Sequence, residues 1–121
     1  MSSLAHNLEQ TVRATSVDVT DEMISVELED GRTISVPTAW YPRLLQSTPA
    51  ERKKYEIDSV GVTWPDIEAD FSIRGLLLGN KSGESQASFK FWLDARRKGK
   101  RVSFDDFLKS RKARRGKKRA A

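Results

Sequence analysis

The strongest constraint on the fold is a pair of alternating segments, residues 23–28 and 32–36, joined across Asp30-Gly31. Apolar and polar residues alternate in both segments, which is typical of half-buried β-strands. Val17 and Val19 alternate in the same way before a turn at residues 20–22, and they mark the end of an earlier strand. The sequence therefore predicts a small antiparallel sheet with meander topology.

The register of this hairpin follows from its loop length. A two-residue turn would place the two apolar rows on opposite faces of the sheet. A three-residue loop, Glu29 to Gly31 with its glycine in the left-handed conformation, pairs Val26 with Ile34 and Ile24 with Val36. We therefore predict the longer loop.

A proline-rich aromatic segment, Pro37 to Leu45, follows the hairpin and supplies Trp40 and Tyr41 as large apolar groups. Its first proline ends strand pairing because it lacks an N–H, and an irregular or single-turn helical segment follows. Thr48-Pro-Ala-Glu51 then combines an N-cap hydroxyl, proline at the first helical position and Glu at the third. A short helix is predicted from about Pro49 to Tyr55.

The chain after this helix alternates between apolar and polar stretches. Ile57 to Val62 predicts a return strand that is interrupted at Gly61 and closed by Trp64-Pro65. Residues 66–70 are predicted to form a polar connection. Residues 72–78 are predicted to form one or two helical turns, which end at a glycine.

The character of the chain changes after a linker at residues 80–84. A helix is predicted over residues 86–98, with Gly99 as its stop. Ser103-Phe-Asp-Asp106 resembles a capping box and starts a second helix. We expect the two helices to pack as a hairpin through two apolar stripes, which are Phe89, Trp92 and Leu93 in the first helix and Phe104, Phe107 and Leu108 in the second. Residues 114–121 are expected to be disordered without a partner.

The predicted fold class is therefore α+β. An α+β domain over residues 1–79, with a small antiparallel sheet and short helices, precedes a basic C-terminal helical hairpin and tail over residues 80–121.

The net charge changes sign at the boundary between these two regions. Residues 1–79 carry seven Lys or Arg against thirteen Asp or Glu, a net charge of −6, whereas residues 80–121 carry fifteen against four, or +11. Clustered basic side chains release counterions from phosphates. The asymmetry therefore points to a polyanionic partner.

Composition excludes several kinds of site. The sequence has no Cys and one His, His6, which lies in a predicted loosely ordered arm at residues 1–10. Disulfides, thiolate metal sites, Ser-His-Asp triads and two-His metal sites within one chain are therefore excluded. No stretch approaches the roughly 18 to 20 apolar residues of a membrane span, and no export signal is evident. We expect a cytoplasmic, non-enzymatic protein with no membrane association, no catalytic residue, no metal site and no cofactor.

Five motifs occur in a fixed order, and together they resemble a known family over about residues 12–80. They are Asp30-Gly31, Trp40-Tyr-Pro-Arg-Leu-Leu45, Thr48-Pro-Ala-Glu-Arg52, Gly61-Val-Thr-Trp-Pro-Asp-Ile-Glu-Ala-Asp70 and Ile73-Arg-Gly-Leu-Leu-Leu-Gly79. The family is the bacterial domain-of-unknown-function family numbered 2442. Thr63 stands where that family commonly has His, and Glu68 where Asp is usual, so no polar role of that His is carried over.

The resemblance implies a small α+β domain with an antiparallel sheet. It also implies a gene that often stands beside a small partner, in arrangements that look like toxin-antitoxin pairs. It implies no established activity, and it does not cover the basic C-terminal region.

The basic C-terminal region is the strongest candidate for function. Clustered charge of this kind provides phosphate contacts to DNA or RNA, although no recognition-helix signature or base-reading motif is present. Basic tails also bind acidic protein surfaces, including this protein's own body, or aid solubility. The candidate nucleic-acid-binding residues are Lys90, Arg96, Arg97, Lys98, Lys100, Arg101, Lys109, Arg111, Lys112, Arg114 and Arg115.

A carboxylate group at Asp66, Glu68 and Asp70 could supply oxygen ligands to Mg²⁺ or Ca²⁺. It lacks the turn glycine and the distal bidentate carboxylate of a calcium loop. We therefore favour solvated carboxylates, with Asp70 helping to cap the following turn.

Three aromatic residues, Trp40, Tyr41 and Trp64, could line a ligand groove. Such residues are more often packed in the core, and we favour packing. Arg43 is interpreted as a partner of the acidic body rather than a substrate clamp.

These patterns favour a nucleic-acid-associated regulatory protein, the antitoxin-like half of a two-gene module. Its expected partners are DNA or RNA and a small protein encoded nearby, with a homodimer as a further option. The alternative is a protein-protein adaptor or inhibitor whose basic arm wraps an acidic partner. A metal-dependent nuclease that uses Asp66, Glu68 and Asp70 is a third reading.

Overall fold

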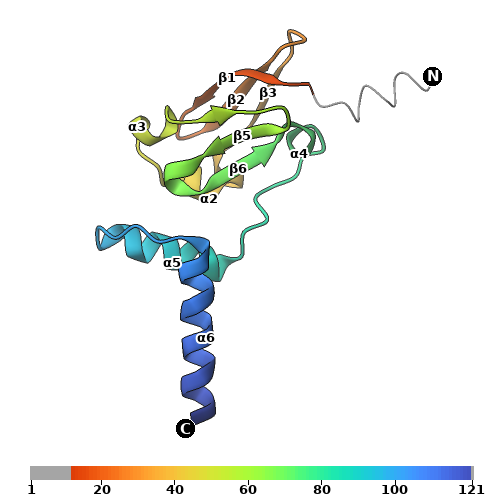
Figure 1. Cartoon of the computed structure of the whole chain (residues 1–121). Coiled ribbons are helices and arrows are strands. Elements are labelled where there is room, and N and C mark those ends of the chain that lie inside the picture. The colour runs from red at the N-terminus through yellow and green to blue at the C-terminus, as the bar shows by residue number, and fades with distance from the viewer. Residues whose placement is uncertain (1–11, 121) are drawn as a thin grey trace, which may run out of the picture. The chain divides into compact units, whose positions relative to one another are not determined.

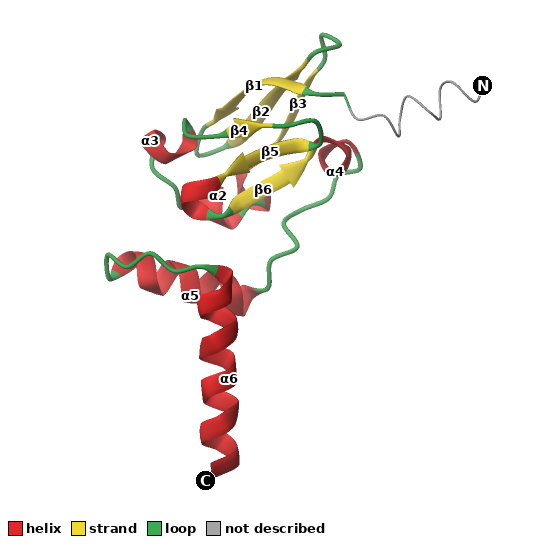
Figure 2. Ribbon diagram, viewed as in Figure 1, coloured by secondary structure: helices red, strands yellow, loops and turns green. Residues whose placement is uncertain are grey.

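The chain divides into two compact units, an N-terminal unit that ends at Ser82 and a C-terminal unit that begins at Gly83. The computed structural model describes residues 12–120, with side chains described as far as Ala113. Among these residues the strands belong to the N-terminal unit, and the C-terminal unit is helical (Figure 2). The α+β class is confirmed, whereas the predicted N-terminal arm with His6 lies outside the described residues.

The first sheet of the N-terminal unit is antiparallel, with strand order β1-β2-β3 (Figure 1). Its strands are β1 (Ala14–Val19), β2 (Met23–Leu28) and β3 (Thr33–Pro37).

The predicted hairpin register is confirmed. Val26 pairs with Ile34 and Ile24 pairs with Val36, so both apolar rows face the core. Gly31 has φ of 93°, a conformation that residues with a Cβ rarely adopt. The loop therefore positions the apolar face, and Ile24 and Val26 are fully buried.

The second sheet is also antiparallel, with strand order β4-β5-β6. Its strands are β4 (Glu56–Ile57), β5 (Gly61–Trp64) and β6 (Ala69–Ser72). Two predictions are corrected here.

The predicted single interrupted strand is two strands joined by a tight turn. The carboxylate of Asp58 accepts hydrogen bonds from the backbone N–H of Val60 (2.7 Å) and of Gly61 (2.8 Å). This side chain closes the turn and reverses the chain, so that Ile57 pairs with Val62.

Strand β6 begins within the predicted polar connection at residues 66–70 and continues to Ser72. Ala69 and Phe71 are buried, while Asp70 is exposed and Ser72 is partly so. Ile67 is also buried, in a 3₁₀ turn that spans Pro65–Ile67. Asp70 therefore lies on the solvent side of an alternating strand, and Asp66 and Glu68 are exposed in the turn before it. The apolar residues between these carboxylates belong to the core.

Four short helical segments complete the N-terminal unit: a 3₁₀ turn (Thr38–Trp40), α2 (Pro42–Leu45), α3 (Pro49–Arg52) and α4 (Ile73–Leu77). The capping box at the start of α3 is confirmed, with Thr48 and Glu51 bonded reciprocally. The helix ends at Arg52 rather than at Tyr55. The Arg52 carbonyl accepts a hydrogen bond from the Trp64 indole (3.0 Å), and the Tyr55 ring packs 6.1 Å from the Trp64 ring.

Aromatic rings form the centre of the N-terminal unit. The Trp64 side chain is fully buried, and its ring lies 5.3 Å from that of Phe71. The Tyr41 ring lies 5.4 Å from Phe71, and its hydroxyl donates to the Asn80 carbonyl (2.8 Å). These contacts join the second sheet to the segment that precedes α2.

The C-terminal unit consists of α5 (Gln86–Arg97) and α6 (Phe104–Ala120). The Ser85 hydroxyl caps α5, and Gly99 follows it with φ of 72°. At the start of α6 the Ser103 N–H donates to the Asp106 carboxylate (2.8 Å), and the Asp106 N–H donates to the Ser103 hydroxyl (3.2 Å). Both predicted helices and the second capping box are confirmed.

Two predictions for the C-terminal unit are corrected. The ring that faces Phe107 of α6 is Phe91 (5.6 Å between centroids), which the predicted stripe on α5 left out. The backbone from Arg114 to Ala120 is helical rather than disordered. Five of the seven residues in this segment are Lys or Arg, which favour helix, none is proline, and cations are stabilising near a helix C-terminus.

Replacing Gly61 by Ala is expected to destabilise the N-terminal unit. An added Cβ would lie 2.0 Å from the Phe71 carbonyl oxygen, which belongs to a paired strand and cannot easily move. We expect a loss of about 2 to 3 kcal/mol in the free energy of unfolding, measured by urea titration. Gly83→Ala is the control, because an added Cβ there meets nothing within 4 Å. Equal stability of the two variants would contradict the tight β5–β6 contact.

Acid should weaken the β4–β5 turn through Asp58. Backbone hydrogen bonds from Gly61 and Val60 hold the pKa of Asp58 below its ordinary value of 3.8. Because the folded-state pKa is lower than the ordinary value of 3.8, the charged Asp58 side chain contributes to stability above pH 3.8. This contribution is lost as the pH falls through the folded-state pKa. Asp58→Asn keeps an acceptor oxygen but does not titrate. Urea midpoints between pH 5 and pH 2 should therefore fall less steeply for this variant, and an unchanged profile would exclude Asp58 as a contributor.

Candidate nucleic-acid interface

The predicted basic residues occupy α5, the connection after it, and α6. Of those with described side chains, Arg96 is half-buried and the rest are exposed. They are Lys90, Arg96 and Arg97 in α5, Lys98, Lys100 and Arg101 in the connection, and Lys109, Arg111 and Lys112 in α6. Arg114 and Arg115 are part of the α6 backbone, but their side chains lie outside the described residues.

Charge separates the two units. The N-terminal unit carries eight Lys or Arg against thirteen Asp or Glu, a net charge of −5, and the C-terminal unit carries fourteen against four, or +10. A surface that attracts phosphates is therefore expected in the C-terminal unit.

Helical spacing gathers basic residues on one face of α6. Counted from Phe104, positions i+4, i+7 and i+8 are Leu108, Arg111 and Lys112, and residues at these spacings share a face. Asp106, at i+2, is displaced from this face, and its carboxylate is engaged in the N-terminal cap. Positive charge thus dominates this face beyond the first turn.

Two of the guanidinium groups make cation–π contacts with aromatic rings. The Arg96 guanidinium lies 5.2 Å from the Trp92 ring centroid, and that of Arg111 lies 5.7 Å from the Phe107 ring centroid. Trp92 and Phe107 are both buried. Cation–π contacts of this kind restrict a flexible side chain and hold its charge at the helix surface. In both pairs the arginine follows the aromatic residue by four positions, and this spacing is visible in the sequence.

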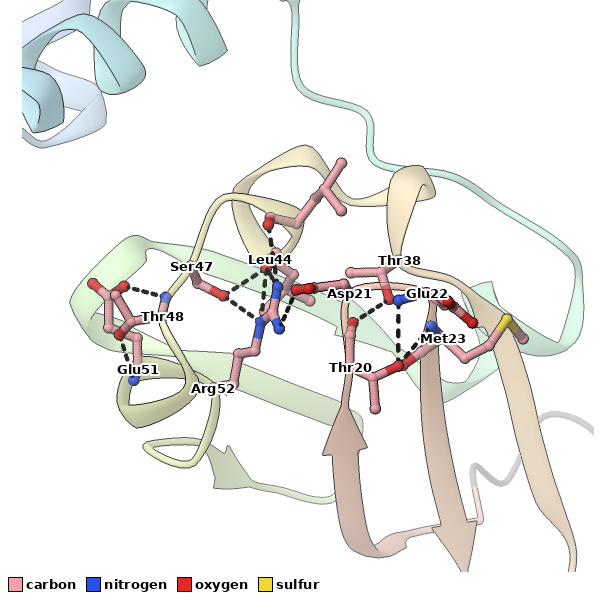
Figure 3. A network of polar contacts seen from close by, with 11 residues as sticks. Thr20, Asp21, Glu22, Met23, Thr38, Leu44, Ser47, Thr48, Glu51 and Arg52 are labelled. Carbon is pink, nitrogen blue, oxygen red and sulfur yellow. Dashed lines mark hydrogen bonds and ion pairs between the residues drawn. The ribbon is translucent and has the colours of Figure 1, made fainter.

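The buried arginines of the N-terminal unit serve its structure instead. Arg52 is 7% exposed, and its guanidinium donates to the carbonyls of Leu44 (3.2 Å) and Leu45 (3.1 Å), to the Ser47 hydroxyl (3.1 Å) and to Asp21 (2.9 Å) (Figure 3). These bonds add donors to carbonyl groups at the end of α2, where the helix lacks its regular hydrogen bonds.

Arg43 is also buried, and its Nη1 donates to the Ile67 carbonyl (2.9 Å). This contact ties α2 to the turn before β6. It supports the structural interpretation of Arg43 over a substrate clamp.

The aromatic residues of the N-terminal unit are mainly core residues. Tyr41 and Trp64 are buried, which confirms the packing interpretation for both. Trp40 is half-buried, and the Lys81 ammonium lies 5.4 Å from the centroid of its ring.

The carboxylates at residues 66–70 are not arranged as a metal site. Within residues 12–120, no group of three or more His, Cys, Asp or Glu side chains is placed to hold a metal ion. Asp66 lies 3.9 Å from the Lys54 ammonium. The cap of α4 is the Ser72 hydroxyl, which accepts from the Gly75 N–H (2.8 Å), so the predicted capping role of Asp70 is wrong.

Removing the Arg52 guanidinium should cost far more stability than removing its carboxylate partner. Arg52→Met removes the donor to the buried Leu44 carbonyl and the partly buried Leu45 carbonyl, and we expect a loss of about 2 to 4 kcal/mol. Asp21 is 86% exposed, so Asp21→Asn should cost less than about 1 kcal/mol. Urea titration of both variants tests this difference, and equal losses would show that the ion pair is the important contact.

Comparison with known proteins supports the fold. A crystal structure of a protein of unknown function from Rhodospirillum rubrum is 24% identical, with a TM-score of 0.52, and the match covers 62% of this chain and 95% of that one. A solution NMR structure of an uncharacterized protein from Chromobacterium violaceum is 21% identical, with a TM-score of 0.55, covering 74% and 85%. Comparison with curated proteins finds no match.

No helix within the described residues has the length and apolarity that crossing a membrane requires. The family model described as "Protein of unknown function (DUF2442)" matches residues 14–82, which leaves the basic C-terminal unit outside the match. The predicted resemblance is confirmed, and the chain belongs to the DUF2442 family.

Proposed function

We propose that this chain is a non-enzymatic, cytoplasmic, nucleic-acid-associated regulatory protein whose C-terminal unit contacts phosphates. The observation that carries the proposal is the exposed basic surface of α5 and α6 in a unit of net charge +10. Basic side chains that neutralise phosphates release condensed counterions, and this release drives sequence-independent binding.

The form of α6 supports a nucleic acid over an acidic protein surface. Its 17 residues make a rod about 25 Å long, and eight of the eleven residues from Lys109 to Arg119 are Lys or Arg. A run of cations this long matches a partner that presents negative charge at regular intervals along its length. Nucleic acid backbones do so at every nucleotide.

The N-terminal unit has a different role in this proposal. Its net charge of −5 disfavours a polyanion, and its buried arginines are engaged in structural contacts. We propose that it binds a small protein encoded nearby or a second copy of the chain, as the antitoxin-like half of a two-gene module. The C-terminal unit would bring that complex to DNA or RNA.

Charge reversal in α6 should weaken binding and its salt dependence. The variant Lys109→Glu/Lys112→Glu removes two exposed cations, and Lys53→Glu/Arg74→Glu makes the same change in net charge in the N-terminal unit. Fluorescence anisotropy with 20-nucleotide single strands and duplexes, at 50 to 200 mM salt, measures affinity. We expect the α6 variant to lose at least about tenfold, with a salt slope lower by about 1.4 to 1.8 for two lost phosphate contacts.

The control variant should retain most of the wild-type affinity. Equal losses in both variants would show that net charge alone is responsible. Absence of wild-type binding at 50 mM salt would exclude the proposed function. A co-purifying protein complex that survives nuclease and depends on Lys109 and Lys112 would favour the adaptor alternative.

A further inference from the structure

Three aromatic rings form a cluster of tilted contacts that extends to the surface of α6. The Phe91 ring lies 5.6 Å from that of Phe107, and the Phe107 ring lies 5.8 Å from that of Phe104. Phe91 is half-buried, Phe107 is 6% exposed and Phe104 is 50% exposed, so the outer ring is the one that solvent reaches. The exposed Phe104 ring therefore packs on one side against the buried Phe107 ring.

The exposed ring belongs to a larger apolar surface. Leu108 is 45% exposed and lies one helical turn after Phe104. Single exposed apolar residues are common in soluble proteins. Phe104 and Leu108 are neighbours on one face of a helix that is otherwise strongly charged, and together they form an apolar contact surface. The charged residues on the same face indicate what kind of partner this surface binds.

Positive charge follows this apolar surface on the same face. Arg111 and Lys112 lie two helical turns after Phe104, at a rise of about 10 Å along the helix axis. The Arg111 guanidinium lies 5.7 Å from the centroid of Phe107, the middle ring of the aromatic cluster. An aromatic ring and cations are thus displayed together within one short stretch of helix.

This combination matches the chemistry of an unpaired nucleotide segment. Every base has a flat face that can stack on an aromatic ring, but a duplex buries these faces between neighbouring base pairs. Phosphates a few nucleotides away would then reach the cations. An acidic protein helix would satisfy the charges but would use the Phe104 ring only as an apolar group, so an aliphatic residue could replace it.

We propose that this face of α6 binds single-stranded nucleic acid, with a base stacked on Phe104 and phosphates bound by Arg111 and Lys112. The proposal rests on the proposed function, because it specifies the nucleic acid that the C-terminal unit prefers. It adds a preference for unpaired over paired strands and assigns that preference to one aromatic ring.

Variants of Phe104 in the full chain test the proposal. Phe104→Leu keeps the apolar character but removes the ring, and Phe104→Trp keeps an aromatic face. Leu78→Ala, at a residue 67% exposed in the N-terminal unit, is the matched control. The probes are a fluorescein-labelled 12-nucleotide oligo-dT, an oligo-U of the same length and a 12-base-pair duplex at 50 mM salt, with far-UV circular dichroism to compare helix content.

We expect Phe104→Leu to weaken oligo-dT or oligo-U binding about tenfold while duplex binding stays unchanged. Phe104→Trp and Leu78→Ala should bind as the wild type does. Equal affinity of Phe104→Leu and wild type for both single strands would overturn the proposal, as would an equal loss toward duplex. Either result leaves the proposed function standing if Lys109→Glu/Lys112→Glu still weakens binding, whereas no wild-type binding to any probe would exclude both.

A protein-docking role would give a different pattern. In that case Phe104→Leu would keep its partner, Phe104→Asp would lose it, and oligonucleotide affinity would be the same for Phe104→Leu as for the wild type. That pattern would contradict base stacking at Phe104.

Discussion

The fold of the N-terminal unit depends on the contact between Trp64 and Arg52. The indole N–H of Trp64 donates to the Arg52 carbonyl, while the Arg52 guanidinium donates to the carbonyls of Leu44 and Leu45. One residue therefore connects the second sheet, α3 and the end of α2. Both side chains are buried, and hydrogen bonds made by buried groups cost more stability when they are lost than bonds made at the surface do.

Arginine has two separate uses in this chain, and burial distinguishes them. Arg43 and Arg52 are buried and donate hydrogen bonds to backbone carbonyls, so these two side chains stabilise loops in the acidic N-terminal unit. Arg97 and Arg111 are exposed in a unit with a large excess of positive charge. The amino-acid sequence does not distinguish the buried structural arginines from the exposed ones. Their fractional exposure and their hydrogen-bond partners do.

Local rules predicted much of the fold. The register around Gly31 and the capping boxes at Thr48 and Ser103 were predicted because each depends on residues close in sequence. Strand β6 and the early end of α3 were missed because they depend on distant partners. Phe71 acquires its role by packing on Trp64, and the Arg52 carbonyl is bonded by an indole twelve residues away. For the candidate interface, the sequence supplied the basic residues but not the exposure of Phe104, which depends on how α5 and α6 pack.

We propose that the C-terminal unit, and α6 above all, binds nucleic acid and that the N-terminal unit does not. An NMR titration of the full ¹⁵N-labelled chain with a 12-nucleotide oligo-dT tests it most directly. We expect amide shift changes concentrated at residues 86–120 and largest around Phe104 to Lys112, with β1 to α4 unperturbed. Changes centred on the N-terminal unit, or no changes at low salt, would contradict it.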